Sequence, residues 1–492
     1  MGKIAKQSIL TTISSYLGVL IGYVNILWLL PFAFSPSQFG VFRTIQDMAL
    51  LLVPFAQMGI GHGITRFFPQ IKSHKFTFFT FSLVLSLLGF LVVAILFLLF
   101  KEQLIQAYAA NSPEVIAYLG IVLLITLLSV LNTILESFAR SFLKIAVPNF
   151  IKDVILRLLV TALIGSYLLA WLDFDQIMWG LVVVYVIVLI LMIGYLLYLK
   201  VFQLNFHFAA ISPQFKKSFL RFSLITFLGT AGSILIMKID SLMVAAMIGL
   251  DANAIYTIAF SIAVVIEMPR RAISQVVMPV IAEKFAENKL SEINDLYKKV
   301  AVNQLLLCLL LFIGIWVNID NLYHYVPNRD IYEAGKWVVL IIGLGKLSDI
   351  IFSINGEIIV FSKFYVFNIT ATLLMSVVVI ILNVLLIPSY GIEGAAIASL
   401  VAMVFYNLIK YFYIKVRLNF SPFSPGLFKI LVLGIVTVAI SQFAIPKMEP
   451  VILDILIRSG LVTLLYVGAV YFLHLAPEVE DMLNKRFKKT QN

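Results

Sequence analysis

Charged side chains that interrupt long apolar stretches are the residues of this sequence with most capacity for chemistry. The deepest, counted from the ends of their stretches, are Arg157, Lys238, Asp240, Glu267, Arg270, Arg271, Lys346 and Asp349. Arginine presents a planar fork of donors that matches phosphate oxygens, and lysine presents a compact positive charge. A carboxyl group removed from water titrates nearer to neutral pH, so the acids could carry a coupling proton or sodium ion. These residues predict a site for a phosphate- or carboxylate-bearing solute.

Helical spacing indicates which of these charges could be neutralised locally, because residues three or four apart are neighbours on a helix surface. Four pairs have that spacing: Asp153 with Arg157, Arg43 with Asp47, Asp454 with Arg458, and Lys346 with Asp349. For each of them a purely structural ion pair is the alternative to a functional role. Glu267 can reach only one of Arg270 and Arg271 well, since consecutive helical residues point about 100° apart. Lys238 is two residues from Asp240 and faces another way, so Lys238 and the arginine doublet are the best candidates for binding a solute.

The elements that must hold these charges are membrane-spanning helices. Of the 492 residues, 62% are hydrophobic and only 12% are charged, which is about half the charge of an ordinary soluble domain. This composition excludes a soluble cytosolic enzyme. About 20 apolar residues cross the hydrocarbon core of a bilayer. Fourteen stretches qualify: 8–34, 39–65, 78–100, 114–138, 147–171, 177–199, 218–249, 252–280, 302–319, 334–360, 364–388, 392–416, 426–445 and 450–474.

The distribution of lysine and arginine between the connecting segments predicts orientation. When the segments are assigned alternately to two sides, the side of the N-terminus holds 24 basic residues and the other side holds 4. Cytoplasmic loops carry the excess of positive charge. We therefore expect a multi-pass protein of the cytoplasmic membrane with both termini in the cytoplasm. The same bias accounts for most of the net charge of +11 without nucleic acid as a partner.

Metal and redox cofactors are not expected. The sequence has one cysteine, Cys308, and five histidines that lie far apart, which excludes a disulfide framework and multi-cysteine zinc or iron–sulfur sites. No connecting segment is long enough for an extramembrane catalytic domain. We expect no catalytic residue, no metal site and no cofactor beyond a coupling H⁺ or Na⁺.

Two parts of the chain, about 214 residues apart, share a pattern. Phe39-Gly40-Val41-Phe42 and Asn253-Ala254-Ile255-Tyr256 each open a long helix that contains or precedes prolines. The alternative is that any two apolar helices look alike. The repeat predicts two six-helix lobes, residues 1–205 and 214–417, followed by two additional helices in 426–474 and a cytoplasmic tail at 475–492. An even number of spans in each repeat makes the repeats parallel.

Three motifs carry a resemblance to a known family. They are Ser37-Gln-Phe-Gly-Val-Phe-Arg43 with Arg66-Phe-Phe-Pro69, Lys238-Ile-Asp240 with Ile248-Gly-Leu-Asp251, and Leu382-Asn-Val-Leu-Leu-Ile-Pro388 with Gly391-Ile-Glu-Gly394. The sequence resembles the polysaccharide-biosynthesis flippases of the MATE-like superfamily, which includes multidrug, oligosaccharidyl-lipid and polysaccharide exporters. Ala254 departs from the family, which often has glycine before the aromatic position. The similarity extends over nearly the whole chain.

This resemblance implies an all-α polytopic membrane protein of about 14 transmembrane helices, with its two lobes in a V around a central cavity. It implies alternating access and transfer of a lipid-diphosphate-linked oligosaccharide, such as an O-antigen, capsule or exopolysaccharide unit, between leaflets. Cationic side chains of the second, seventh and eighth helices would hold the diphosphate; by position these are Arg43, Lys238, Arg270 and Arg271. We add Lys346 to this substrate-binding set. Four acids form the candidate cation-coupling set: Asp47, Asp240, Glu267 and Asp349.

Other functions remain open at this stage. A cation-coupled drug antiporter would favour an acidic or aromatic cavity, and the deep basic residues argue against it. A lipid II flippase shares the expected number of fourteen spans. A membrane polysaccharide polymerase or ligase usually needs a large outer loop, and a non-transporting scaffold is a further alternative. The expected partners are the lipid-linked oligosaccharide and membrane lipid, with a polymerase or glycosyltransferases as candidates, and the expected state is a monomer.

Overall fold

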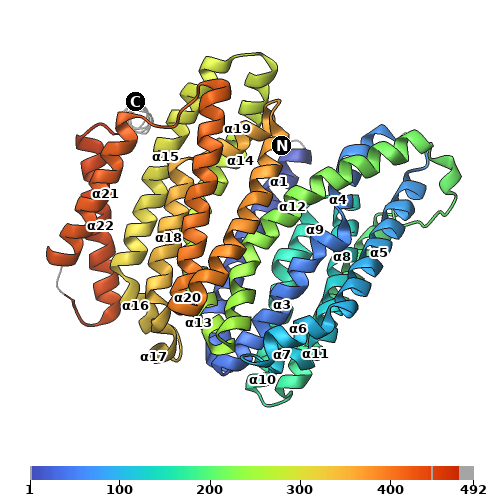
Figure 1. The fold of residues 1–492 in the computed structure, drawn as a ribbon, viewed down its shortest axis with the longest axis horizontal. Coiled ribbons are helices and arrows are strands. Elements are labelled where there is room, and N and C mark those ends of the chain that lie inside the picture. The colour runs from blue at the N-terminus through green and yellow to red at the C-terminus, as the bar shows by residue number, and fades with distance from the viewer. Residues whose placement is uncertain (1–2, 72, 445–446, 476–492) are drawn as a thin grey trace. The chain divides into compact units, whose positions relative to one another are not determined.

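The part of the chain that the structure describes consists of helices joined by connecting segments. The structure is a computed structural model that describes residues 3–71, 73–444 and 447–475. These residues form α-helices with short 3-10 and π segments, and no strand occurs among them (Figure 1). Lys72 and most of the predicted cytoplasmic tail, from residue 476 onward, lie outside the described residues. The all-α, multi-pass expectation is confirmed for the described chain.

The chain divides into two compact units, residues 1–257 and 258–492. This division falls inside α13, whereas the predicted lobes meet between residues 205 and 214; the lobe boundaries remain a prediction. The first unit contains the following elements: α1 Lys3–Val24, η1 Asn25–Leu29, α2 Leu30–Ala33, α3 Pro36–Gln57, α4 Ile60–Phe67, η2 Phe68–Gln70, α5 Lys75–Leu99, α6 Lys101–Ala109, α7 Glu114–Ala117, α8 Leu119–Ser141, α9 Ala146–Phe150, η3 Ile151–Ile155, α10 Leu156–Leu168, α11 Phe174–Tyr198, η4 Phe208–Ala210, α12 Pro213–Met247 and the start of α13, Leu250–Val264.

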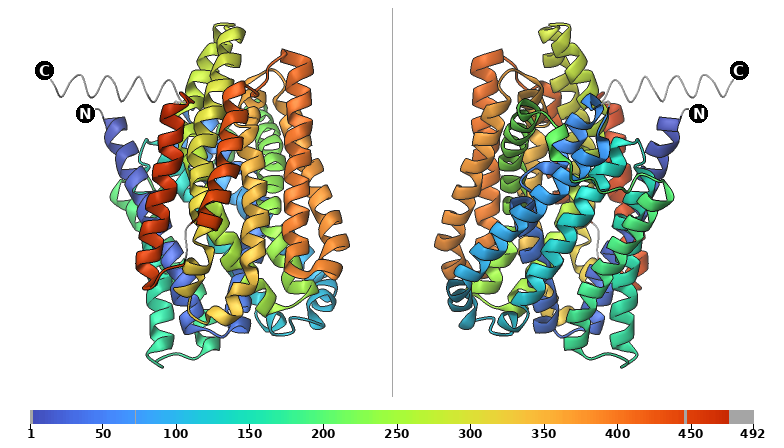
Figure 2. Two further views of the ribbon diagram at one scale, coloured as in Figure 1. Left: turned by 90° about the vertical axis from the view of Figure 1, so that its left-hand side faces the viewer. Right: turned by 90° about the vertical axis from the view of Figure 1, so that its right-hand side faces the viewer.

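The second unit begins within α13 and contains the remaining helices. They are η5 Val265–Glu267, α14 Met268–Ala286, α15 Leu290–Val317, α16 Ile319–His324, α17 Arg329–Tyr332, η6 Glu333–Gly335, α18 Lys336–Ile351, α19 Asn355–Phe361, α20 Tyr365–Leu418, α21 Pro425–Ala444 and α22 Val451–Phe472. The last two, which correspond to the predicted additional helices, pack against each other and against α15 (Figure 2).

The number of membrane spans agrees with the expectation of about 14 once three local features are counted. Eleven described helices are long and apolar enough to cross a membrane, and the bent pair Arg329–Ile351 with Asn355–Phe361 makes a twelfth. The 54 residues of α20 form two helices, since Gly391 (φ 60°, ψ −137°) interrupts the helical backbone. The continuous helix α9–η3–α10 makes the remaining span. Its charged residues Lys152, Asp153 and Arg157 reduce its apolar character.

Helix α3 is the central element of the first unit and packs against α5, α8 and α12. Its start is well defined, because Ser35 and Gln38 form a reciprocal capping box on either side of Pro36. Aromatic rings fill the space between α5 and α8; the rings of Phe79 and Phe138 stack with centroids 4.2 Å apart. This packing fixes the helices whose polar faces form the site described below.

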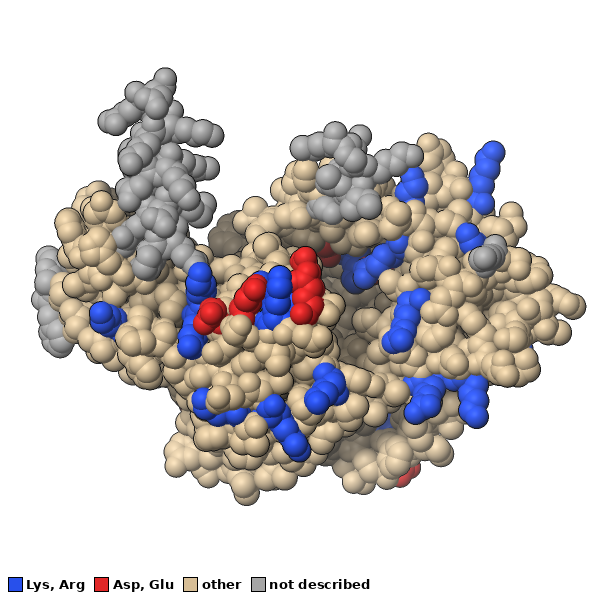
Figure 3. Space-filling model, turned by 90° about the horizontal axis from the view of Figure 1, so that it is seen from above, with Lys and Arg blue, Asp and Glu red and all other residues tan. Residues whose placement is uncertain are grey.

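Large apolar side chains also cover the outer surfaces of several helices. On α5, for example, Leu88, Leu91, Val92 and Ile95 are all more than half exposed. Such surfaces are unfavourable in water and expected against lipid tails. By contrast, basic side chains predominate over acidic ones on the face shown in Figure 3. A face of that composition fits the lysine and arginine bias of the connecting segments.

Candidate substrate cavity and ion-pair clusters

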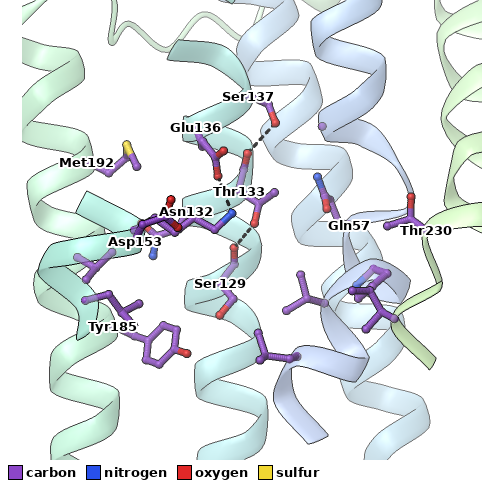
Figure 4. Close-up of a pocket in the computed structure, with 18 of the residues that line it drawn as sticks. Gln57, Ser129, Asn132, Thr133, Glu136, Ser137, Asp153, Tyr185, Met192 and Thr230 are labelled. Carbon is purple, nitrogen blue, oxygen red and sulfur yellow. Dashed lines mark hydrogen bonds and ion pairs between the residues drawn. The ribbon is translucent and has the colours of Figure 1, made fainter. Parts of the chain in front are cut away.

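A cavity of about 560 Å³ lies within the first unit. Helices α3, α4, α8, α11 and α12 and the helix α9–η3–α10 supply its walls (Figure 4). Its neutral polar lining includes Gln57, Ser129, Asn132, Thr133 and Thr230. Four cations and two acids complete the charged lining: Arg140, Lys152, Arg157 and Lys238 with Glu136 and Asp153. The lining thus has an excess of two positive charges.

Glu136 is the centre of one charged group in this cavity. Its two carboxylate oxygens accept from Arg140 Nη2 at 2.6 Å and from Lys152 Nζ at 3.1 Å. Arg140 comes from the same helix at i,i+4, whereas Lys152 comes from η3. Because Arg140 and Lys152 are about half exposed, they can exchange Glu136 for another anion at little cost.

Among the described residues, Arg157 is the cation of the cavity that makes no ion pair. Sequence spacing predicted a pair between Asp153 and Arg157, and the structure shows that this prediction is wrong. Residues Ile151–Ile155 form a π-helical segment, so the α-helical i,i+4 rule does not apply to them. Asp153 accepts instead from Ser15 Oγ of α1 at 2.9 Å. The Nη1 atom of Arg157 is buried without a hydrogen-bond partner, which leaves a donor available for a ligand.

A second charged group lies where α3 meets α12. Lys238 Nζ donates to Asp47 Oδ1 at 2.7 Å, and Arg43 Nη2 lies 3.4 Å from the same oxygen. The predicted pair of Arg43 and Asp47 is therefore confirmed. Lys238 has its main partner on α3, 191 residues away in the chain, and local spacing could not show this. Asp47 is only 2% exposed.

Asp240 is separate from that group. It is 3% exposed and accepts a hydrogen bond from Tyr256 Oη of α13 at 3.0 Å. Since Lys238 and Asp240 are two residues apart on α12, their side chains point in different directions, as the spacing predicts. Asp240 is not part of the lining of the cavity.

The remaining predicted residues form a cluster in the second unit, centred on Glu267. Lys346 Nζ of α18 lies 2.8 Å from Glu267 Oε2, and Arg271 Nε donates to Oε1 at 3.2 Å. The spacing of Lys346 and Asp349 predicted a local pair, and this is wrong because Lys346 reaches across to Glu267 instead. Arg270 Nη1 is 3.8 Å from Glu267, so Glu267 favours one member of the arginine doublet, as expected.

Arg270 has its own acid. Its Nη1 lies 3.1 Å from Asp349 Oδ2, and its Nη2 donates to the carbonyl oxygen of Ser353 at 3.1 Å. Its Nε is buried without a hydrogen-bond partner. Arg271 differs, because about half of its side chain is exposed. The doublet therefore combines one enclosed and one accessible guanidinium.

A second polar cavity of about 470 Å³ lies in the same unit, between α15, α16, α18, α21 and α22. Asp454 and Arg458 form the predicted i,i+4 pair there, at 3.0 Å. Asp320 accepts from Lys336 at 2.5 Å and from Lys447 at 3.0 Å. Burial opposes ionisation of Asp320, but the two lysines outweigh it and hold the pKa of this carboxyl below its usual value.

The structure divides both the substrate-binding and the cation-coupling candidates between the two units, so members of each set lie in each unit. Arg43, Asp47 and Lys238 come together in the first, and Glu267, Arg270, Arg271, Lys346 and Asp349 in the second. The substrate-binding and cation-coupling sets leave out the other charged residues of the larger cavity, although Arg157 was counted among the deepest charges: Glu136, Arg140, Lys152, Asp153 and Arg157. The depth of Arg157 in its apolar stretch was the available signal. Among the described residues, no group of three His, Cys, Asp or Glu could hold a metal ion.

Comparison with known proteins identifies the family. The sequence model of the family described as "Polysaccharide biosynthesis protein" matches residues 4–285. The chain belongs to this family. An uncharacterized membrane protein of Methanocaldococcus jannaschii is 20% identical over 477 residues, with 92% of each chain covered.

Solved structures of transporters have the same fold. The lipid II flippase MurJ in an inward closed conformation aligns with a TM-score of 0.68 and 15% identity, covering 96% of this chain and 99% of MurJ. A multidrug resistance MATE family transporter in an inward-facing conformation aligns with a TM-score of 0.62 and 16% identity, covering 82% and 94%. Family and fold together support a multi-pass membrane protein with the fold of these two transporters.

Proposed function

We propose that this protein transfers a lipid-diphosphate-linked oligosaccharide across the cytoplasmic membrane by alternating access, with both termini in the cytoplasm. The substrate would be a unit of O-antigen, capsule or exopolysaccharide. The observation that carries the proposal is the cavity of the first unit, with its excess of two positive charges and its unpaired Arg157. A diphosphate linked at both ends carries two negative charges and would balance that excess.

Guanidinium and ammonium groups form short, charge-assisted hydrogen bonds with phosphate oxygens. Nη1 of Arg157 is a donor that no group among the described residues accepts from, so binding of a phosphate there breaks no hydrogen bond of that atom. The polar amides and hydroxyls along the wall, including Gln57, Asn132 and Thr230, are suited to sugar hydroxyls. A cationic drug would meet repulsion in the same cavity, which disfavours the antiporter alternative.

The cluster of the second unit supplies the other proposed substrate-binding residues, Arg270, Arg271 and Lys346. Arg271 is the most accessible of them. The coupling ion, H⁺ or Na⁺, would be carried by acids of the proposed set: Asp47, Asp240, Glu267 and Asp349. A lipid II-type substrate is the second candidate, supported by the alignment with MurJ over 96% of this chain, which extends to the two last helices. Both substrates share the diphosphate group.

The proposal is tested by transfer of a fluorescent lipid-diphosphate-oligosaccharide between leaflets of vesicles that contain the purified protein. We expect Arg157→Gln to slow transfer about tenfold or more, because a charge-assisted bond to an ionised group contributes roughly 1.5–3 kcal/mol. The pair of changes Arg270→Gln and Arg271→Gln should slow it as well.

Lys101→Gln is the matched control, since Lys101 is an exposed cation on α6 outside the cavity; its transfer rate should equal that of the unaltered protein. Unchanged transfer by the Arg157 variant would contradict the role of the first cavity, and unchanged transfer by the double variant would contradict that of the arginine doublet. Efflux of an organic cation driven by H⁺ or Na⁺ would favour the antiporter instead.

A further inference from the structure

We infer that Lys238 binds the anionic group of the substrate and is paired with Asp47 before the substrate binds. When Lys238 turns to the substrate, Arg43 replaces it as the counter-ion of Asp47. The inference rests on the proposed function and deepens it, because it concerns how the same cavity changes its charge pairing on binding. In this account Lys238 binds the anion, Asp47 holds Lys238 before binding, and Arg43 neutralises Asp47 after Lys238 has left.

Lys238 has contacts with two environments. Its Nζ donates to Asp47 Oδ1 at 2.7 Å, and its side chain also lines the cavity. Asp47 is buried and is not part of the lining. A lysine head on a flexible four-carbon stem can therefore leave the carboxylate for the cavity without movement of α12. Of Arg43, Asp47 and Lys238, only Lys238 contacts both the Asp47 carboxylate and the cavity, since Arg43 is also absent from the lining.

Arg43 lies close enough to Asp47 to become its counter-ion. Its Nη2 is 3.4 Å from the same Oδ1 atom that Lys238 occupies, which is longer than the usual 2.7–2.9 Å of a charge-assisted hydrogen bond. Its Nε is buried and has no hydrogen-bond partner. A guanidinium can approach a carboxylate with two parallel N–H groups. Departure of Lys238 would free Oδ1 for this arrangement and satisfy the unpaired donor.

The carboxylate itself is held by neutral groups. Asp47 Oδ2 accepts from Ser241 Oγ at 3.0 Å, and the same hydroxyl lies 2.8 Å from Asn253 Oδ1. Asn253 Nδ2 donates in turn to Thr44 Oγ1 at 2.8 Å. These contacts involve neither cation, so an exchange of cations leaves the position of Asp47 unchanged.

The charges balance after the exchange. Lys238 and Arg43 share the single negative charge of Asp47. The positive charge that this carboxylate does not neutralise is therefore available to the anion when Lys238 turns to it. Tyr108 of α6 and Tyr185 of α11 are the phenols within electrostatic range of Asp47, and phenols are neutral near pH 7. With Arg43 beside it, Asp47 stays ionised throughout binding. The coupling proton therefore belongs to another acid, which narrows the proposed coupling set to Asp240, Glu267 and Asp349.

The experiment is titration calorimetry of the full-length protein in detergent with a citronellyl-diphosphate-linked hexose, a diphosphate substituted at both ends that does not titrate near neutral pH. Repeating the titration in buffers of different ionisation enthalpy gives the number of protons exchanged on binding. We expect no exchange for the unaltered protein. We expect uptake of about one proton for Arg43→Gln, because Asp47 then loses its only replacement cation and an unpaired buried charge is unfavourable.

Three further variants complete the test. Arg43→Lys keeps the positive charge and should show no proton uptake, and adding Asp47→Asn to Arg43→Gln should abolish the uptake. Asp47→Asn alone should bind the ligand roughly tenfold more tightly, since Lys238 no longer has a competing ionised partner. Binding by Arg43→Gln without proton uptake would overturn the inference, as would weaker binding by Asp47→Asn. If the unaltered protein binds no ligand at all, the proposed function fails and the inference fails with it.

Discussion

At the scale of single residues, Asp320 shows how a carboxylate outside the spans links stability to pH. Lys336 and Lys447 hold its pKa below the ordinary value of 3.8 despite partial burial. A depressed folded-state pKa means that the stabilisation is complete above the unfolded-state pKa. It is lost as the pH falls through the folded-state pKa. The contact between α16, α18 and the segment before α22 should therefore loosen only in acid.

This gives a prediction for Asp320→Asn. The variant should unfold at a lower temperature than the unaltered protein at pH 7, and the difference should shrink as the pH falls from about 4 into stronger acid. Thermal unfolding of the detergent-solubilised protein across that range measures it. Asp330→Asn, which changes a nearby exposed acid with no ion pair among the described residues, is the control. A difference that is constant with pH would contradict the role assigned to the two lysines.

The sequence predicted which charged residues lie deep in the apolar stretches, but it did not predict many of their ion-pair partners. Arg43 with Asp47 and Asp454 with Arg458 followed the i,i+4 rule and were predicted correctly. Lys238 with Asp47 and Lys346 with Glu267 join different helices, and no local spacing encodes such pairs. The pair of Asp153 and Arg157 failed for a different reason, a local change in the helix type.

At the scale of elements, close approach of helices decides where glycine is needed. A Cβ atom on Gly40 of α3 would collide with the carbonyl oxygen of Leu250 at the start of α13. The sequence marked this segment by the Phe39–Phe42 pattern, without a reason for the glycine. The structure supplies the reason, which is contact between two helix backbones.

We predict that Gly40→Ala destabilises the protein by about 1–3 kcal/mol, the usual cost of overpacking. The matched control is Gly120→Ala on α8, where a Cβ has nothing within 4 Å; that change should be neutral or slightly stabilising. Thermal unfolding midpoints of both variants in the same detergent provide the comparison. Equal midpoints for the two variants would show that α3 and α13 tolerate a wider separation.

The helical elements themselves were largely predictable, because some twenty apolar residues in a row leave few other structures in a bilayer. The boundaries were harder. The expected break between residues 388 and 392 agrees with Gly391, but the sequence reveals neither the backbone angles of that turn nor the bend of 46° between α18 and α19. Both features depend on backbone angles at single residues, which hydropathy does not report.

At the scale of the whole molecule, the proposed orientation is open to a direct test. The chain has one cysteine, Cys308, and it is fully buried. In a Cys308→Ser background, we expect Glu102→Cys to react with a membrane-impermeant maleimide added to intact cells. Lys289→Cys should react only after the membrane is permeabilised, because its segment carries the cytoplasmic excess of basic residues. Both positions are exposed, so accessibility within the protein is matched. Reaction at position 289 in intact cells would reverse the orientation.

The π-helical segment Ile151–Ile155 has a consequence for how relatives of this protein could change specificity. A π turn holds one more residue than an α turn, so loss of one residue from this segment would restore a regular α-helix. Side chains after the segment, Arg157 among them, would keep their direction, because the deletion removes the one residue that the π turn holds in excess. Deletion of the single codon for Lys152 could thus remove one cation from the cavity and leave Arg157 in place. Among homologues, we expect chain length in this helix to vary together with the charge of the substrate.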